Sequence, residues 1–384
     1  MTSLLSRDEY AALESRVYLN QASLGLIPRR STQAMVEFLV EVAQHGNVRL
    51  SDEAEAHVLD ELRAIGARLL DAQLGAMAVV GGASEALGQL AALTASPGGE
   101  VVLVASDFPS VTYPWLAARE RLGMAIRWVH DEPLRPLTAA LVDGIGDGTT
   151  VVCFGAVQFA TGSVVDVAEV VRRARAVGAR VIVDVTQMAG AMPVSMRAWH
   201  ADALVCSGYK WLSSHGGVAL LAVGDQLLER VPILVGWKGT DDPFALNPTT
   251  MALASDARRF ELSTIAYSSA VGLTTSVNLL SSVGIDALHA HAGSLSRGLV
   301  EAVAPLGWTP FREPADASAS SHIVSLRHET LAADVVQQRL AAEHDIVVST
   351  RLGRVRVSVH GYNDGDDVAR FVTALGAIAE TPAG

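Results

Sequence analysis

The sequence predicts an α/β protein in which a mostly parallel sheet lies between helices and a smaller α+β domain follows toward the C-terminus. Two observations support this fold class. From residue 78 onward, short apolar runs alternate with helical patterns, which is typical of parallel strands joined by helices. In the last hundred residues the pattern changes to helices interspersed with a few short strands. We therefore expect a large domain at residues 17–260 and a small domain at residues 261–384, with residues 1–16 packed against the small domain.

The composition limits the kind of protein and its partners. Half of the 384 residues are hydrophobic and 18% are charged, which is typical of a packed globular protein. The formal net charge of -12 disfavours nucleic acid and anionic membrane surfaces as partners. No apolar run reaches the about 18 residues of a membrane span, and the N-terminus lacks the apolar core of a signal peptide. We expect a cytoplasmic protein that acts on small molecules.

The two cysteines, Cys153 and Cys206, both fall in apolar, strand-like runs. Neither has metal-ligand spacing with a histidine, so we expect no metal site. We interpret both as reduced core residues of a cytoplasmic protein rather than as a disulfide pair.

Short apolar runs and helical spacing give the expected elements in chain order. After a short extended entry at 17–19, the expected strands of the large domain lie at 79–80, 100–105, 125–130, 150–154, 180–183, 203–206 and 218–223, and its expected helices at 31–42, 51–74 and 165–177. Beyond these, helices are expected at 268–283, 287–303, 332–344 and 366–378, with strands at 323–326, 346–350 and 355–359.

The strand at 203–206 leads into a Gly/Ser-rich loop that carries Lys210. Because Ser207 and Tyr209 flank this lysine instead of other charges, it can be partly desolvated, which makes its amine a better nucleophile toward a carbonyl. The chemistry that this favours is a Schiff base. By itself the motif also fits an ordinary loop lysine.

The strand at 180–183 ends at Asp184, with Gln187 close behind. An acid at the carboxyl end of a buried strand needs a positive partner, and a protonated pyridine nitrogen would suit it. The chain between Asp184 and Lys210 is long enough for one helix and the next strand. The alternative is an aspartate that caps the following loop.

Two further strand ends carry candidate binding groups. The glycine-rich turn after residue 80 opens a helix at Ala83 and Ser84, whose free N–H groups and hydroxyl could hold a phosphate. This turn matches neither a Walker A loop nor a GxGxxG fingerprint, and a simple helix cap is the alternative. Phe108 follows the strand at 100–105, where an aromatic plane could stack on a flat ring or pack locally.

The candidate substrate contacts are Asn20 and Arg356. Asn20 lies in a turn and either faces the site or only shapes that turn. Arg356 lies in an alternating apolar strand, and its planar fork suits a substrate carboxylate. The alternative is a salt bridge with an acid such as Asp345.

Together, six motifs resemble those of class V aminotransferases, the fold-type I pyridoxal-phosphate group that includes cysteine desulfurases, kynureninase and isopenicillin N epimerase-like enzymes. The motifs in chain order are Gly82-Ala-Ser-Glu85, Asp107-Phe-Pro-Ser110, Val183-Asp-Val-Thr-Gln187, Ser207-Gly-Tyr-Lys210, Arg259-Phe-Glu-Leu-Ser-Thr264, and Val355-Arg-Val-Ser358 followed by Tyr362-Asn363. They cover nearly the whole chain and are specific for the cofactor but not for the reaction.

This resemblance implies roles for the polar groups around a pyridoxal 5′-phosphate cofactor. Lys210 would form the Schiff base with the cofactor, Asp184 would pair with the pyridinium nitrogen, and Gln187 would contact the ring hydroxyl. Phe108 would stack on the ring, where desulfurases have a histidine. Arg356 would bind the substrate carboxylate.

The resemblance also implies a phosphate site shared between two subunits. Ala83, Ser84, Ser207 and Tyr209 would hold the phosphate, with Tyr209 in place of a common histidine. Thr264 would reach the phosphate of the neighbouring subunit, which implies a homodimer with shared active sites. The loop at 158–162 departs from the family pattern, because desulfurases place an asparagine near the ring there.

The reaction implied is one at the α-carbon of an amino acid through an external aldimine. Desulfurases need a sulfur-accepting cysteine in the small domain, and residues 318–356 contain none. We therefore expect a C–S β-lyase that acts on a cysteine-type thioether. Epimerisation, amino transfer and decarboxylating (oxidative) deamination are the alternatives within the family. A catalytically silent protein that uses the same fold for binding is the alternative of a different class.

Overall fold

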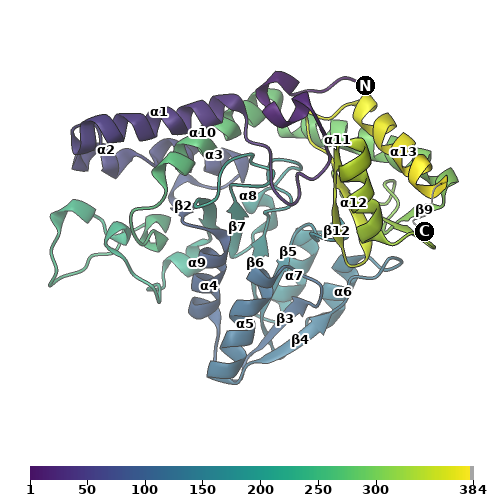
Figure 1. The fold of residues 1–384 in the computed structure, drawn as a ribbon. Helices are drawn as coiled ribbons and strands as arrows, with labels where there is room; N and C mark the ends of the chain where they lie inside the picture. The colour runs from purple at the N-terminus through teal and green to yellow at the C-terminus, as the bar shows by residue number, and fades with distance from the viewer. Residues whose placement is uncertain (381–384) are drawn as a thin grey trace.

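The computed structural model describes residues 1–380 and is organised around a seven-stranded sheet (Figure 1). The strands in spatial order are β2 (Met77–Val80), β8 (Ala219–Val223), β7 (Ala203–Ser207), β6 (Arg180–Asp184), β5 (Thr149–Gly155), β3 (Glu100–Val104) and β4 (Ala125–Val129). Only β8 runs antiparallel to its neighbours in this sheet. The expected fold-type I arrangement, with a mostly parallel sheet between helices, is confirmed.

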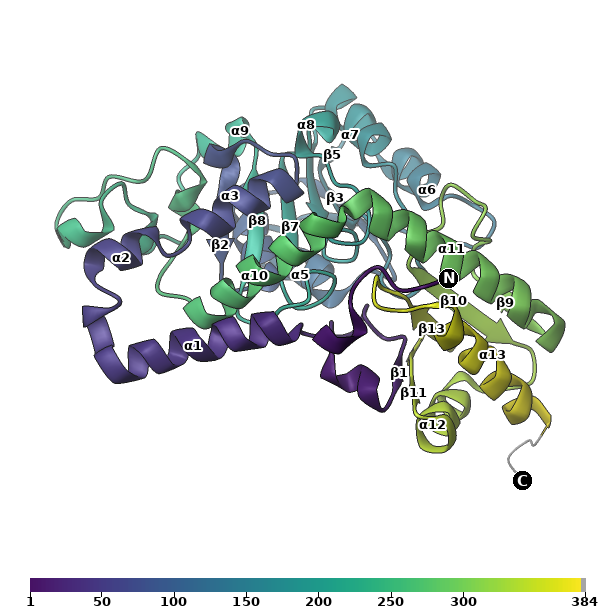
Figure 2. The ribbon, with the colours of Figure 1, turned by 90° about the horizontal axis from the view of Figure 1, so that it is seen from above.

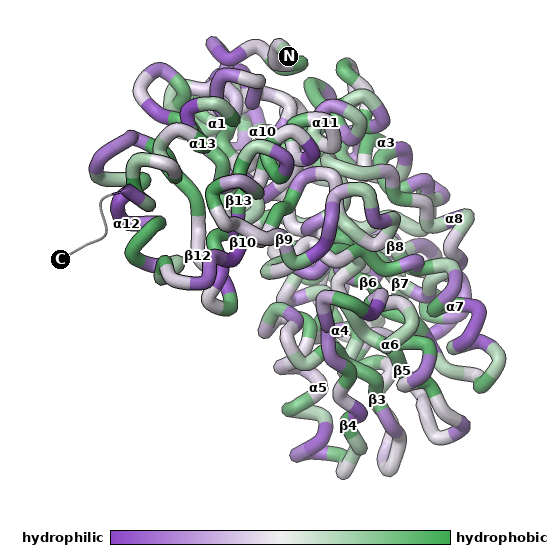
Figure 3. The backbone as a smooth tube through the Cα atoms, turned by 90° about the vertical axis from the view of Figure 1, so that its right-hand side faces the viewer, coloured by the Kyte–Doolittle hydropathy of each residue, from purple (hydrophilic) through white to green (hydrophobic). Residues whose placement is uncertain are grey.

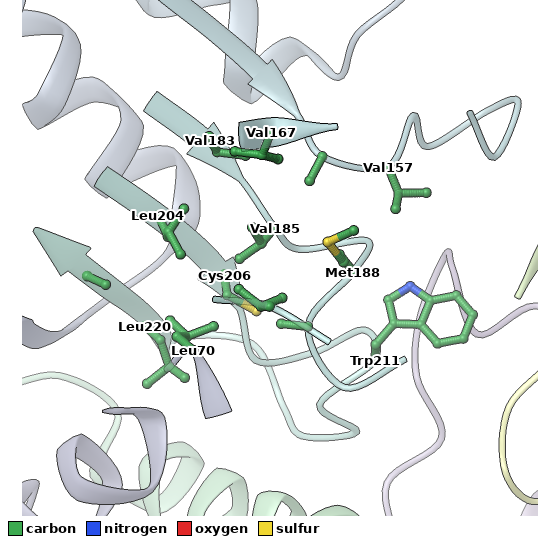
Figure 4. Close-up of a cluster of buried hydrophobic side chains, with 14 of the residues drawn as sticks. Leu70, Val157, Val167, Val183, Val185, Met188, Leu204, Cys206, Trp211 and Leu220 are labelled. Carbon is green, nitrogen blue, oxygen red and sulfur yellow. The ribbon is translucent and has the colours of Figure 1, made fainter. Parts of the chain in front are cut away.

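Helices cover both faces of this sheet because its strands are apolar on both sides. On one face, alternate residues such as Val101 and Val205 pack with α4 (Ala83–Thr94) and α5 (Pro109–Leu122). The opposite face carries Val183, Leu204 and Cys206, part of the cluster drawn in Figure 4. The helices next to that face are α3 (Asp60–Leu69), α6 (Leu137–Gly144), α7 (Val167–Ala176), α8 (Met196–Trp199) and α10 (Tyr267–Val283).

The hydropathy of the chain follows these layers. Figure 3 shows strand β3 as hydrophobic and helix α7 as mixed, as expected for a buried strand and a helix with one exposed face. Within residues 1–380 no single helix is both long and apolar enough to cross a membrane. The pair Tyr267–Val283 and Ile285–Leu306, bent by 75°, meets that criterion only by length and composition.

A four-stranded antiparallel sheet forms the core of the C-terminal part. Its strands in spatial order are β12 (Ser349–Arg351), β13 (Arg354–Ser358), β10 (Ile323–His328) and β9 (Trp308–Pro310). Val355 and Val357 point to one face, where they join the buried cluster of the helices. Those helices are α11 (Ile285–Val303), α12 (Ala333–His344) and α13 (Gly365–Glu380). The opposite face of this sheet carries Arg354 and Arg356, because side chains alternate along a strand.

The N-terminal segment packs with this C-terminal part. Strand β1 (Val17–Tyr18) pairs in parallel with β11 (Ile346–Val347), and Arg7 forms an ion pair with Asp367 at 2.8 Å. Helix α1 (Arg29–His45) then runs along α10, as Figures 1 and 2 show. Helix α10 also packs on α3, one of the helices that cover the large sheet. The domain limit after residue 260 stays a prediction.

Two expected elements are divided in the structure. The helical region at 51–74 forms α2 (Asp52–His57) and α3, separated at Val58 and Leu59. The strand expected at 346–350 forms β11 and β12, because the first pairs with β1 and the second with β13. The α-helices that the sequence did not indicate are α5, which contains Pro114, α6, and the short α8 and α9 (Asp225–Leu228).

Candidate active site

The carboxyl ends of the parallel strands deliver polar side chains to one edge of the large sheet. Since these ends lie at the same edge, Asp184 after β6 and Ser207 after β7 come together there. They line a pocket of about 160 Å³. Its lining residues are Gly82, Ala83, Ser84, Phe108, Ser110, Asp184, Thr186, Ser207, Tyr209, Lys210, Gly216, Gly217 and Val218. A larger cleft of about 730 Å³ at the opposite edge, next to Arg180 and Asp202, contains none of the candidate residues.

Lys210 is 6% exposed and carries the only amine that lines this pocket. Its Nζ lies 5.0 Å from the centroid of the Phe108 ring and 5.7 Å from that of Tyr209. Burial lowers the pKa of Lys210 to about 8, although the charge of Asp184 opposes this shift. The amine is therefore available as a neutral nucleophile or base close to neutral pH.

Asp184 forms no ion pair with any of residues 1–380. The backbone N–H of Thr186 donates to its Oδ1 at 2.8 Å. Burial raises the pKa of Asp184, although the hydrogen bonds of Thr186 and the charge of Lys210 oppose the shift. A partly buried carboxylate without its own cation is suited to pair with a cationic ligand atom.

The neighbouring Asp107 holds Phe108 in place. Its carboxylate accepts the N–H of Phe108 at 2.7 Å and that of Gly155 at 2.8 Å, which ties this loop to the end of β5. Burial raises the pKa of Asp107 to about 7. The Phe108 ring meets Phe159 edge to face at 5.4 Å between centroids. The aromatic plane therefore lies over Lys210 in a defined orientation.

The N-terminus of α4 forms one wall of the pocket. Gly82 precedes the helix without a side-chain cap, so the first N–H groups, including those of Ala83 and Ser84, have no partner within the helix. The Ser84 hydroxyl lies 2.6 Å from that of Ser110, which the sequence analysis did not single out. Free amides with hydroxyls at a helix N-terminus favour an anion.

Arg356 on strand β13 does not line the pocket and is 1% exposed, but, in addition to burial, its charge contributes to the lowered pKa of Lys210. Its guanidinium donates to Ser349 Oγ at 3.0 Å, to the Phe159 carbonyl at 2.6 Å and to Ser23 Oγ at 2.5 Å. No acid among residues 1–380 lies within ion-pair distance, so the alternative of a salt bridge with Asp345 is wrong. Burial lowers the pKa of Arg356 to about 9, and the charge of Arg351 adds to the shift. This guanidinium therefore lacks a counterion.

A family model described as aminotransferase class-V matches residues 17–371. The chain belongs to this family.

Relatives of this class V aminotransferase match along almost the whole chain. A probable cysteine desulfurase of Aeropyrum pernix is 30% identical over 98% of this chain and 97% of its own length. A structure of the cystine C–S lyase C-DES with cysteine persulfide has a TM-score of 0.87 at 22% identity and covers 96% of this chain and 99% of that one. A C-DES variant with glycine covalently linked to its pyridoxal-phosphate cofactor has the same TM-score and identity, covering 97% and 99%. The solved structures show the shared fold.

The pocket of this class V aminotransferase fits pyridoxal 5′-phosphate, the cofactor of the family. The free amides of α4, with nearby serine hydroxyls, suit the phosphate. Asp184 suits the pyridinium nitrogen, because it has no cation of its own, and Phe108 offers a ring face. Lys210 is the amine that can bond to the aldehyde carbon. The protein is thus a pyridoxal-phosphate-dependent enzyme.

Gln187 is turned away from this pocket. Its Nε2 donates to the Ala22 carbonyl at 3.0 Å, and its Oε1 accepts the indole N–H of Trp211 at 2.7 Å. The side-chain amide therefore holds the N-terminal segment and the lysine loop together. Its contact with the cofactor hydroxyl stays a prediction.

Gln21 is a positioning residue that the sequence analysis missed. Its buried Nε2 donates to the Lys210 carbonyl at 3.0 Å and to Ser213 Oγ at 2.9 Å, while its Oε1 accepts the Tyr362 hydroxyl at 2.7 Å. Nearby, a Cβ on Gly25 would lie 2.1 Å from the Lys210 carbonyl oxygen, so only glycine fits there. The only sequence signal for this contact was Tyr362 in the last motif.

The two remaining candidates lie at the margins of the site. Asn20 forms a backbone bridge with Ser358, two residues from Arg356, and its buried Oδ1 has no hydrogen-bond partner among residues 1–380. Thr264 is exposed, outside the pocket, with its hydroxyl 3.4 Å from Glu55. Its role toward a neighbouring subunit stays a prediction.

Proposed function

We propose that this member of the class V aminotransferase family is a C–S β-lyase, an enzyme that cleaves the carbon–sulfur bond of a cysteine-type thioether. The position of the two cysteines carries the proposal. Cys153 in β5 and Cys206 in β7 lie in the core of the sheet, at 1% and 0% exposure. Burial raises the pKa of both thiols, and neither lines the pocket. Without a protein thiol to accept sulfur, the sulfur leaves with the substrate's own group as a free thiol.

The chain supplies the groups that this elimination needs. Pyridoxal phosphate, when bound, supplies a sink for the electrons of a bond broken at the α-carbon. Arg356 binds and orients the substrate carboxylate, and Lys210 removes the α-proton through its neutral Nζ. Asp184 favours the protonated state of the ring nitrogen. The Cα–H and Cβ–S bonds break, and with one water the products are a thiol, pyruvate and ammonium.

We also propose that the enzyme is a homodimer in which Thr264 reaches the phosphate site of the partner subunit. Exposed apolar side chains support an interface of this kind. They lie on α1 and in the segment 231–251, at Val36, Leu39, Val40, Val231, Ile233, Leu234, Val235, Trp237, Leu246 and Met251.

A cytoplasmic location stays a prediction.

Turnover of S-substituted cysteines by the purified holoenzyme tests the lyase proposal. We expect thiol and pyruvate in equal amounts, because one C–S bond is broken for each pyruvate formed. The Lys210→Ala variant is the control and should produce neither at a measurable rate, since no other amine lines the pocket.

The same incubation in deuterated water separates the alternative reactions. Deuterium at the α-carbon without thiol or pyruvate contradicts the lyase proposal and favours epimerisation or amino transfer. Release of carbon dioxide contradicts it in favour of decarboxylation. Absence of exchange with every amino acid tested indicates a binding protein.

A further inference from the structure

Arg351 is a second guanidinium next to Arg356. Neither lines the pocket itself, but both are close enough for their charges to contribute, in addition to burial, to the lowered pKa of Lys210. Arg351 lies on strand β12, and its Nη2 is 3.4 Å from Ser23 Oγ, the same hydroxyl that accepts from Arg356. The register Ser349↔Arg356 and Arg351↔Arg354 puts both arginines on the face opposite the hydrophobic core. Two guanidinium groups therefore converge on one serine hydroxyl.

Neither guanidinium has a carboxylate partner among residues 1–380. Acids pair elsewhere with buried arginines of this protein, for example Asp131 with Arg312 at 2.9 Å. Burial is the main reason that the pKa of Arg356 is lowered, and the charge of Arg351 adds to it. The charge of Arg351 likewise contributes to the lowered pKa of Lys210, after burial. Two like charges that share one hydroxyl disfavour each other, and an anion between or beside them would relieve this.

The number of free N–H groups on Arg356 and Arg351 indicates how many anions the two side chains can bind. A guanidinium has five N–H donors, and three hydrogen bonds of Arg356 are already made to Ser349, Phe159 and Ser23. The two that remain are enough for one bidentate carboxylate. Arg351 donates only to the Thr350 carbonyl and, weakly, to Ser23, so most of its donors are free. One substrate carboxylate saturates Arg356 and leaves the charge of Arg351 without a partner.

We propose that Arg351 forms a second anion subsite, which selects amino-acid substrates whose side chain ends in an anionic group. Such a substrate places its α-carboxylate on Arg356 and its distal anion on Arg351, so that both cations gain a counterion. This inference rests on the proposed function. If the enzyme is a C–S β-lyase, its substrate class is a cysteine thioether whose side chain ends in a carboxylate or a comparable anion.

Two isosteric substrates test the charge requirement. S-carboxymethylcysteine and S-carbamoylmethylcysteine differ only in a terminal carboxylate or amide. For the wild-type holoenzyme we expect kcat/KM at least tenfold higher with the carboxylate. In Arg351→Gln this preference should disappear, because the variant loses activity on the carboxylate substrate by a much larger factor than on the amide. Arg327→Gln, which removes an exposed arginine on strand β10, is the matched control and should retain the preference.

Binding of non-reacting anions tests the subsite without turnover. By calorimetry, succinate should bind the holoenzyme at least tenfold more tightly than its monoamide succinamate, and Arg351→Gln should remove the difference. Arg351→Lys retains the charge and should keep most of the preference for succinate. It therefore serves as a control for a folding defect in the glutamine variant. If the dianion preference is found without turnover of either thioether, the lyase proposal fails and the subsite stands.

Three results overturn the subsite. One is equal binding of succinate and succinamate by the wild-type protein. Another is an equal loss of activity on both thioethers in Arg351→Gln, which would mean that both arginines hold the α-carboxylate. The third is an unchanged preference for the carboxylate thioether in that variant.

Discussion

Two buried arginines differ in their partners. Arg63 lies on helix α3, which covers one face of the large sheet, and Arg356 lies on strand β13 of the small sheet. Arg63, 7% exposed, donates to both oxygens of Glu261 at 2.8 and 2.6 Å. Burial alone would lower the pKa of Arg63, but the hydrogen bonds and charge of Glu261 outweigh it and raise the pKa. For Arg356 burial is not compensated, and the pKa falls. A buried arginine with its own acid supports the fold, whereas one without an acid is available to a ligand.

The largest expected effect is on stability, at the paired arginine. Arg63→Met leaves Glu261 charged and unpaired in the interior, so we expect a loss of about 3–5 kcal/mol in the free energy of unfolding. The measurement is denaturant unfolding of the wild type and the variant. The double variant with Glu261→Gln should recover much of the loss, because glutamine is neutral and still accepts the N–H of Val79. Equal stability of wild type and single variant would mean that this pair is not structural.

A third buried cation, Lys210, extends the comparison to pH. Its folded-state pKa of about 8 lies below its usual 10.5, so the unfolded chain binds more protons between these values. The stability of the apoprotein should therefore rise with pH across this window, by about 3 kcal/mol, because each pKa unit corresponds to about 1.36 kcal/mol. Below pH 8 the amine of Lys210 is protonated in both the folded and the unfolded state, so the full cost of burying its charge remains.

Unfolding curves of the wild-type and Lys210→Met apoproteins from pH 7 to 11 measure this contribution. The difference between the two isolates Lys210 from other groups that titrate in the same range. The variant should be the more stable protein near pH 7, and the two should converge toward pH 11. A constant difference would place the amine in a solvated position.

The smallest expected change in stability is at Arg356. Arg356→Met leaves no acid unpaired, and relief of the uncompensated burial of the guanidinium opposes the loss of its hydrogen bonds to Ser349, Phe159 and Ser23, so we expect a much smaller net loss of stability than the loss of about 3–5 kcal/mol for Arg63→Met. The same variant should raise KM for amino-acid substrates at least tenfold, because it removes a charged hydrogen bond worth about 1.5–3 kcal/mol. Binding of the corresponding amines, which lack a carboxylate, should change much less. Equal changes for acids and amines would move the carboxylate site elsewhere.

The sequence was sufficient to predict the large-domain half of the site. Parallel strands end at a common edge, so Asp184, Ser207 and Lys210 could be expected together from their positions after apolar runs. The glycine-rich turn likewise predicted that a helix begins at Ala83 and Ser84, and both residues line the pocket. These inferences depend on local patterns and on one topological rule, and both are visible in a single sequence.

The small-domain half was less predictable because it depends on contacts between distant segments. No local pattern shows that Gln21 reaches Lys210, or that Gln187 is engaged by Trp211. Whether Arg356 has an acid nearby is decided by the packing of strands far apart in the chain, so the sequence left both possibilities open. The division of the strand at 346–350 has the same origin, since β1 comes from the other end of the chain.

The segment from β1 to Gly25 links the two halves mechanically. Strand β1 belongs to the small domain through its pairing with β11, and a few residues later Gln21 and Gly25 hold the backbone of the lysine loop. A rotation of the small domain over the pocket would therefore pull on the loop that carries Lys210. The N-terminal segment is thus hydrogen-bonded to the loop that carries Lys210 and also pairs with strand β11.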